Sequence, residues 1–146
     1  MSTSRLRARC PSAVAIATGY VVGRQLRFHK VGKDGTAKAD AHWTGDQNDR
    51  LYGVVFRCLL AERPTLDSCE SLGVGYDEAV VDVVIEGEPE PRRLFLYEAY
   101  ADKVQPGLPT ASWYVAHVVS GAAEHGLPTH YQELLAEMIA LQERVG

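Results

Sequence analysis

The spacing of apolar residues changes near residue 105, and this change constrains the fold more than any other feature of the sequence. Before it, β-branched and apolar residues gather in short runs that are typical of strands, at 13–22, 25–29, 51–59, 79–85 and 92–100. After it, apolar residues recur at helical spacing in 111–122 and 131–139. Gly126 and Pro128 separate these two helices, with Gly126 as the expected left-handed cap.

The strand-like runs are expected to pair as hairpins. The first hairpin joins 13–22 to 25–29 through Gly23, with Gly19 marking a bulge, and the second joins 79–85 to 92–100. Residues 31–50 are rich in Gly, Asp, Lys and Asn and predict a long loop. Strands followed by helices indicate an α+β fold: a small mixed, mostly antiparallel β-barrel or sheet with flanking helices, two of them C-terminal.

Composition narrows the class of protein. The 146 residues, 46% of them hydrophobic, predict a single domain over 1–146. A net charge of -4 without a basic stripe argues against nucleic acid as a partner. No apolar run approaches the roughly 20 residues that span a bilayer, and no signal segment is evident, so a cytoplasmic protein without membrane contact is expected. The three cysteines lack the spacing of a disulfide framework or a zinc ribbon.

The segment Leu66–Glu70 is the main candidate for chemistry. Pro64 fits the first turn of a short helix, and Gly53 in the preceding strand suggests a close backbone approach. A carboxylate near a helix start is usually a solvated charge, so Glu70 needs companions before an acid-base role is inferred. Candidate companions are tyrosines at segment ends, where hydroxyls can reach a ligand: Tyr76, Tyr100 and Tyr114.

A histidine metal site and a cysteine nucleophile are the alternatives to acid-base chemistry at Glu70. His117, His125 and His130 share one helical region, but they lack the four-residue offset of a zinc helix and flank a break, so surface or capping roles are expected. Cys69 could act as the nucleophile of a thiol-dependent acyl transferase, which would require a histidine within hydrogen-bond reach of its sulfur.

The ordered set of motifs resembles the gamma-glutamylcyclotransferase family. Tyr52–Phe56 is similar to the family's Gly-Val-Val strand, and Leu66-Asp67-Ser68-Cys69-Glu70 is similar to its Leu-Asp-x-x-Glu, with Tyr76 following. Tyr114 and the run from Ser120 to Tyr131 resemble its Tyr and its closing Gly-Ala-x-x-x-Gly-Leu-Pro-x-x-Tyr. The similarity extends from about Arg5 to Leu135.

Two departures from the family pattern stand out. Ser71 follows Glu70 where the family usually has Gly. The family also begins with a strand and a Tyr-Gly-Ser-Asn substrate loop, commonly followed by Met and a short helix; here Met1 stands at that Met. We therefore expect the reading frame to start one methionine late, which would leave this chain weak or inactive and expose a sheet edge through which it could form homo-oligomers.

The resemblance implies a reaction and a site. The α-amine of a γ-glutamyl group attacks its own γ-carbonyl, releasing 5-oxoproline and an amine, amino acid or peptide, with Glu70 as general base and acid. It implies Tyr76, Tyr100 and Tyr114 as substrate-binding residues and no metal or organic cofactor. The alternative is a non-catalytic module that binds a small ligand on the same fold, which full solvent exposure of Glu70 would favour.

Overall fold

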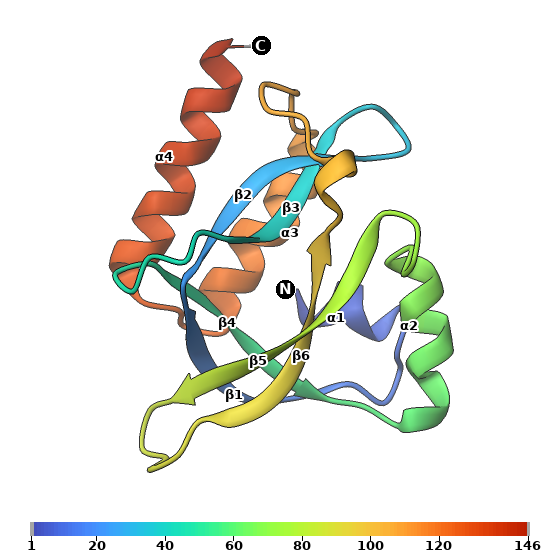
Figure 1. Cartoon of the computed structure of the whole chain (residues 1–146), viewed down its shortest axis with the longest axis vertical. Helices are drawn as coiled ribbons and strands as arrows, with labels where there is room; N and C mark the ends of the chain where they lie inside the picture. The colour runs from blue at the N-terminus through green and yellow to red at the C-terminus, as the bar shows by residue number, and fades with distance from the viewer. Residues whose placement is uncertain (1, 146) are drawn as a thin grey trace.

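A computed structural model describes residues 2–145, with side chains described for 2–140, so Met1 lies outside the described residues. Strands form the middle of the molecule, with α4 on one side and α2 on the opposite side (Figure 1). α1 lies against α3: the Thr3 hydroxyl hydrogen-bonds His125 at the end of α3, and the Arg5 guanidinium lies over the Trp113 ring. The helices are α1 (Thr3–Arg7), α2 (Arg63–Cys69), α3 (Ser112–Glu124) and α4 (Thr129–Val145), with short 3-10 turns at Leu60–Glu62 and Ala101–Lys103. The strands are β1 (Val14–Val22), β2 (Arg24–Val31), β3 (Ala37–Trp43), β4 (Arg50–Arg57), β5 (Tyr76–Ile85) and β6 (Arg92–Ala99).

The strands form two antiparallel sheets. One has the order β4-β1-β5-β6, and the other pairs β2 with β3. The predicted α+β class, the antiparallel pairing, the β5–β6 hairpin and the two C-terminal helices are confirmed. The described strands do not close into a barrel, so a sheet with flanking helices is the correct form of that prediction. None of the described helices is both long and apolar enough to cross a bilayer.

The expected hairpin between 13–22 and 25–29 is wrong. β1 pairs with β4 and β5, whereas β2 pairs only with β3 among the described strands. The single residue between β1 and β2 is Gly23, at φ 82°, and there the chain leaves one sheet for the other. Local alternation predicts a strand correctly, but its partner depends on contacts distant in the sequence.

The loop predicted over 31–50 contains β3. Its alternate residues Ala37, Ala39 and Ala41 are small, so the strand carries little of the bulky β-branched signal that identifies strands in a sequence. Ala37 is fully buried all the same. Small side chains suit this strand because it packs closely against its neighbours.

Gly19 marks a close approach of two strands, while the bulge predicted there lies between Ala15 and Ala17. A Cβ added to Gly19 would lie 2.5 Å from the backbone oxygen of Val84 on β5. Its partner on β4, Gly53, was expected to allow such an approach but has no atom within 4 Å of an added Cβ.

Replacing these paired glycines is expected to have opposite effects. Gly19→Ala should lower the free energy of unfolding by about 1 to 3 kcal/mol, because the methyl group overlaps the Val84 carbonyl. Gly53→Ala should leave stability unchanged or raise it by about 0.5 kcal/mol, because the site has room and the unfolded chain loses freedom. Urea unfolding of both variants measures the difference; equal effects would contradict the close approach.

Candidate functional site

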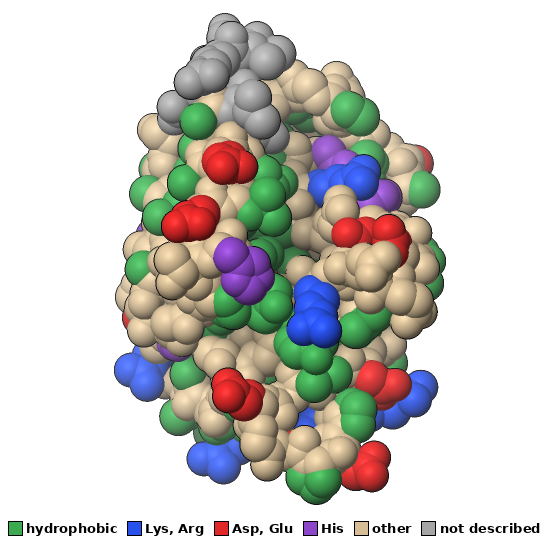
Figure 2. Space-filling view, turned by 90° about the vertical axis from the view of Figure 1, so that its left-hand side faces the viewer, with side chains coloured by type: hydrophobic (Ala, Val, Ile, Leu, Met, Phe, Trp, Pro, Cys, Tyr) green, Lys and Arg blue, Asp and Glu red, His purple; other side chains and the backbone are tan. Residues whose placement is uncertain are grey.

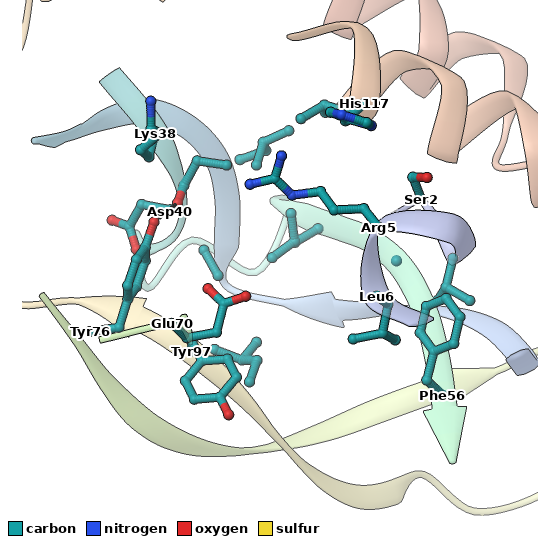
Figure 3. Close-up of a pocket in the computed structure, with 18 of the residues that line it drawn as sticks. Ser2, Arg5, Leu6, Lys38, Asp40, Phe56, Glu70, Tyr76, Tyr97 and His117 are labelled. Atoms are coloured by element: carbon teal, nitrogen blue, oxygen red, sulfur yellow. Dashed lines mark hydrogen bonds between the residues drawn. The ribbon is translucent and has the colours of Figure 1, made fainter. Parts of the chain in front are cut away.

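A cavity of about 760 Å³ lies among the strands and helices. Two clusters of buried apolar residues line it, one built around Leu6 and Leu66 and the other around Leu127 and Leu135. Figure 2 shows hydrophobic side chains gathered in a hollow on one face of the molecule. The charged side chains of the lining are Arg5, Lys38, Asp40 and Glu70, labelled in Figure 3, together with Arg9, Lys30, Lys33 and Asp34.

Glu70 ends α2, where the sequence suggested a helix start. Its backbone N–H donates to the carbonyl oxygen of Leu66, and the chain then turns through Ser71 at φ 54°, the one left-handed residue other than glycine among those described. This turn directs the carboxylate into the cavity (Figure 3). The position at the negative end of a helix disfavours a charged carboxylate.

Burial and nearby cations act on Glu70 in opposite directions. The side chain is 17% exposed, and one of its oxygens lies 3.1 Å from Nη1 of Arg9. Burial raises the pKa of Glu70 above its ordinary value, and the positive charges of Arg9, Arg5 and Lys30 oppose this without cancelling it. A carboxyl group with a raised pKa exchanges protons closer to neutral pH than an exposed one does.

Tyr76 and Tyr114 hold the same residue of β3. The Tyr76 hydroxyl donates to the carbonyl oxygen of Ala39 at 2.7 Å, and the N–H of Ala39 donates to the Tyr114 hydroxyl at 2.9 Å. Burial raises the pKa of both phenols, so both keep their protons at neutral pH. The Tyr114 hydroxyl accepts a hydrogen bond from the Ala39 N–H, and none of the described residues accepts a hydrogen bond from it. The hydroxyl can therefore donate to a ligand.

The tyrosines predicted from the sequence are only partly brought together. Tyr76 and Tyr114 line the cavity with Glu70, whereas Tyr100 lies beyond the end of β6 and is not among the lining residues. Tyr97 lines it instead and hydrogen-bonds Asp67 of α2. Tyr97 was not singled out from the sequence, because alternation does not show which face of a strand meets a cavity.

The cations of the cavity were missed by sequence reasoning. Arg5 and Arg9 are four residues apart, a spacing that places both on one side of the N-terminal helical turn and could have identified them. Lys30 is buried, and its ammonium lies 4.8 Å from the centre of the Tyr76 ring. Burial lowers the pKa of Lys30, and the charge of Glu70 partly opposes this shift. Nothing in the sequence around Lys30 indicated burial.

Of the other candidate residues, Cys69 and His117 also line the cavity, whereas His125 and His130 do not. His125 hydrogen-bonds the Thr3 hydroxyl at 2.9 Å, and the ring of His130 packs against Tyr52. Cys69 is exposed, and among the described residues no hydrogen bond joins it to a histidine. The three described residues that bring metal-ligand atoms within 4.8 Å of one another are His29, Asp40 and His42.

Comparison with known proteins identifies the fold and then the family. A structure titled gamma-glutamyl cyclotransferase superposes with a TM-score of 0.82 at 23% identity, covering 92% of this chain and 80% of the other. A crystal structure of an uncharacterized protein from Homo sapiens gives 0.81 at 24% identity, with the same coverage. YkqA from Bacillus subtilis gives 0.70 at 18% identity, covering 94% of this chain and 48% of YkqA. The fold is therefore that of gamma-glutamyl cyclotransferase.

The sequence model of the AIG2-like family matches residues 50–135, and the chain belongs to this family. The matched segment runs from β4 to α4 and includes Glu70, Tyr76 and Tyr114. Among curated proteins, no sequence match reaches significance. The resemblance stated from the sequence is thus confirmed for family and fold.

Replacing Ser71 with the family's usual glycine should stabilise the protein. A non-glycine residue in the left-handed region costs about 1 to 2 kcal/mol, and part of this is offset by the greater freedom of glycine when unfolded. Ser71→Gly should therefore raise the free energy of unfolding by about 0.5 to 1 kcal/mol, whereas Ser68→Gly within α2 should lower it. Chemical denaturation tests both; destabilisation by Ser71→Gly would contradict the left-handed turn.

The raised pKa of Glu70 predicts a pH-dependent stability difference. Between the unfolded pKa, about 4.3, and the higher folded pKa, the folded state binds more protons, so stability falls as pH rises through this window. Glu70→Gln removes the titrating group, so the variant does not lose this stability. Its advantage over the parent protein should be largest above the folded pKa of Glu70. Melting curves from pH 4 to 8 should show the difference growing with pH; a constant or shrinking difference would contradict the raised pKa.

Proposed function

We propose that this protein is a gamma-glutamyl cyclotransferase-like enzyme that releases 5-oxoproline from γ-glutamyl amino acids, peptides or amines. The observation that carries the proposal is the largely buried carboxylate of Glu70, directed into a cavity large enough for such a substrate, with its pKa raised by burial. The fold shared with gamma-glutamyl cyclotransferase supports the same assignment. Because Glu70 is not fully exposed, it does not meet the condition that would favour the binding module.

The chemistry needs little more than positioning and proton transfer. Glu70 takes a proton from the substrate ammonium, and the freed amine forms a bond to the γ-carbonyl carbon. The bond from that carbon to the leaving nitrogen then breaks as Glu70 returns a proton to the leaving nitrogen. The ring nitrogen loses its second proton to the Glu70 carboxylate, which releases it to solvent before the next turnover. A carboxyl group whose pKa is raised toward neutrality serves in both directions.

The cations near Glu70 have a role in this scheme. Arg5, Arg9 and Lys30 surround the carboxylate that must act as a base, and the substrate brings a carboxylate of its own. The guanidinium of Arg9 lies 3.1 Å from Glu70 and is partly exposed, so it can exchange Glu70 for the substrate carboxylate as its ion-pair partner. Loss of this ion pair on substrate binding would further raise the pKa of Glu70 and strengthen it as a base.

The alternative function is binding without catalysis. The ion pair between Arg9 and Glu70 favours it, because a carboxylate held by a guanidinium is a weaker base than a free one. In that case Glu70 would only accept a hydrogen bond from a small γ-glutamyl-like ligand. The two functions predict different products and are separated by one assay.

Glu70→Gln should lower the rate of 5-oxoproline release by at least about 100-fold, because the amide cannot accept the ammonium proton. The assay incubates this chain, and a protein extended by the upstream codons, with γ-glutamyl dipeptides, a γ-glutamyl tripeptide and γ-glutamylamines. Glu133→Gln, an exposed glutamate on α4, is the matched control and should keep full activity. Equal release by parent and Glu70→Gln proteins would refute the catalytic role, and ligand binding without release would support the binding module.

A further inference from the structure

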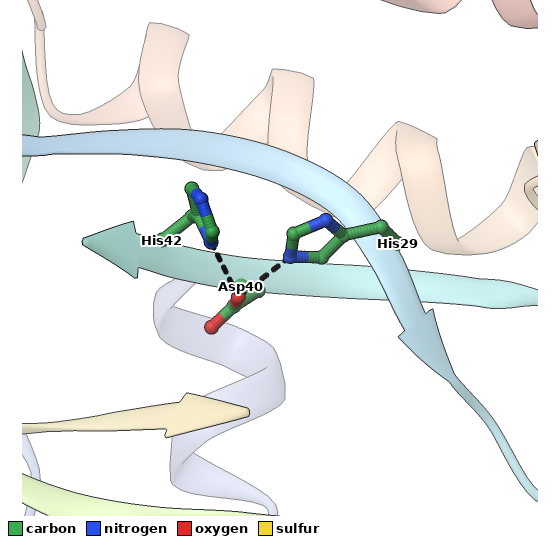
Figure 4. Close-up of side chains that lie close together, drawn as sticks. All are labelled: His29, Asp40 and His42. Carbon is green, nitrogen blue, oxygen red and sulfur yellow. Dashed lines mark hydrogen bonds and ion pairs between the residues drawn. The ribbon is translucent and has the colours of Figure 1, made fainter. Parts of the chain in front are cut away.

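The β2–β3 hairpin brings two imidazoles and a carboxylate together (Figure 4), and of these three residues only the carboxylate, Asp40, also lines the cavity of Glu70. Asp40 and His42 are two residues apart on β3, so their side chains project from the same face of the strand. His29 lies on β2 at a break in register, where Phe28 pairs with Ala39 and Lys30 pairs with Lys38. A bulge redirects the side chain of the extra residue, and here it turns His29 toward Asp40.

The three ligand atoms face a common point. Nε2 of His29 lies 2.7 Å from Oδ2 of Asp40, and Nδ1 of His42 lies 3.8 Å from the same oxygen. The two imidazole rings meet edge to face, with centroids 5.1 Å apart and an angle of 87° between their planes. Ligand atoms about 2.0 to 2.1 Å from a tetrahedral ion lie about 3.3 Å from one another, a value between the two observed separations.

The surroundings hold Asp40 in place. Its side chain is 3% exposed, and Oδ1 accepts the backbone N–H of Ala99 on β6 at 2.8 Å, which leaves Oδ2 directed at both histidines. A fixed hydrogen bond to the second carboxylate oxygen is the kind of support that metal-ligating carboxylates receive. Arg24, on the same hairpin, is paired with Glu98 at 2.6 Å, which offsets its positive charge.

A hydrogen-bonded pair alone does not account for His42. The contact between His29 and Asp40 satisfies both groups, whereas 3.8 Å is too long for His42 to hydrogen-bond Asp40. His42 and Asp40 also line a second cavity, of about 340 Å³, together with Ala99, Ala101 and Val104. This cavity gives access from one side and room for a water molecule beside the three side chains.

We propose that His29, Asp40 and His42 bind one divalent transition-metal ion of the Zn²⁺ class, with a fourth position open to the smaller cavity. Two imidazole nitrogens and one carboxylate oxygen form a ligand set that suits Zn²⁺ and the neighbouring divalent ions. The ion would take the place of the hydrogen bond between His29 and Asp40. The site does not depend on the chemistry of Glu70.

Such an ion would link the β2–β3 hairpin to β6, and the hairpin also forms part of the wall of the larger cavity. Through Asp40 and Ala99 it would join the hairpin to β6, and Asp40 directly follows Ala39, the residue held by Tyr76 and Tyr114. Asp40 lines both cavities. Metal binding should therefore raise the melting temperature of the folded protein as a ligand specific to the native state does.

The test is calorimetric titration of the tag-free protein, first treated with chelator, with Zn²⁺, followed by melting curves with and without the ion. One equivalent should bind, and His42→Gln should weaken binding by at least about tenfold and abolish the rise in melting temperature. His42 is suited to this test because its side chain is about one-third exposed and makes no close hydrogen bond with Asp40. His130→Gln, an exposed histidine outside the cluster, is the matched control and should bind as the parent does.

The thiols of Cys10 and Cys58, which lie close together, are the rival ligands. Titration with Co²⁺ distinguishes them, because thiolate ligands add intense near-ultraviolet absorption that imidazole and carboxylate do not. Visible bands of a tetrahedral nitrogen and oxygen site, lost in His42→Gln, would support the proposal. Absence of saturable Zn²⁺ binding, thiolate absorption alone, or binding unaffected by His42→Gln would overturn it.

Discussion

The close approach of β1 and β5 at Gly19 is the constraint that joins the two halves of the four-stranded sheet, β4-β1 and β5-β6. β4 and β5 lie on opposite sides of β1, so α2, which connects them, must cross from one side of this strand to the other. The crossing ends at Glu70, and β5 then begins at Tyr76. A side chain at Gly19 would overlap the Val84 carbonyl and separate β1 from β5 at the end of β5 that lies far along the strand from Tyr76. Gly19 also lines the cavity, so the contact that joins β1 to β5 forms part of the cavity wall.

The cavity brings together charges that would be unremarkable at the surface. Glu70, Lys30, Arg5 and Arg9 are each partly or wholly removed from water, so burial shifts the pKa of Glu70 upward and that of Lys30 downward. Each shift favours the neutral form, while attraction between the opposite charges favours the ionised forms. A site balanced in this way can bind a substrate carboxylate and move a proton without large structural change, which is the basis of the proposed function.

β3 connects the two sites proposed for this protein. It carries Ala39, held on both sides by tyrosine hydroxyls, followed by Asp40, which faces two histidines. This strand is also the element that the sequence did not predict. Its alanines give no strong strand signal. Asp40 and His42 form a cluster with His29 because the bulge in β2 turns His29 toward them, and the sequence does not show this bulge. Because a loop was predicted here, the sequence indicated neither this part of the cavity wall nor the cluster of ligand residues.

The sequence by itself determined the α+β class, the β5–β6 hairpin, both C-terminal helices and the Leu66–Glu70 segment, because these follow from local spacing, turn residues and an ordered set of family motifs. It also selected Glu70, Tyr76 and Tyr114, which do line one cavity. Only the tertiary structure decided that β1 pairs with β4 and β5 rather than with β2. It also decided that Tyr97 rather than Tyr100 lines the cavity and that Lys30 is buried beside Tyr76. Strand partners, the inward face of a strand and the burial of a charge all depend on residues distant in sequence, and local patterns carry no record of them.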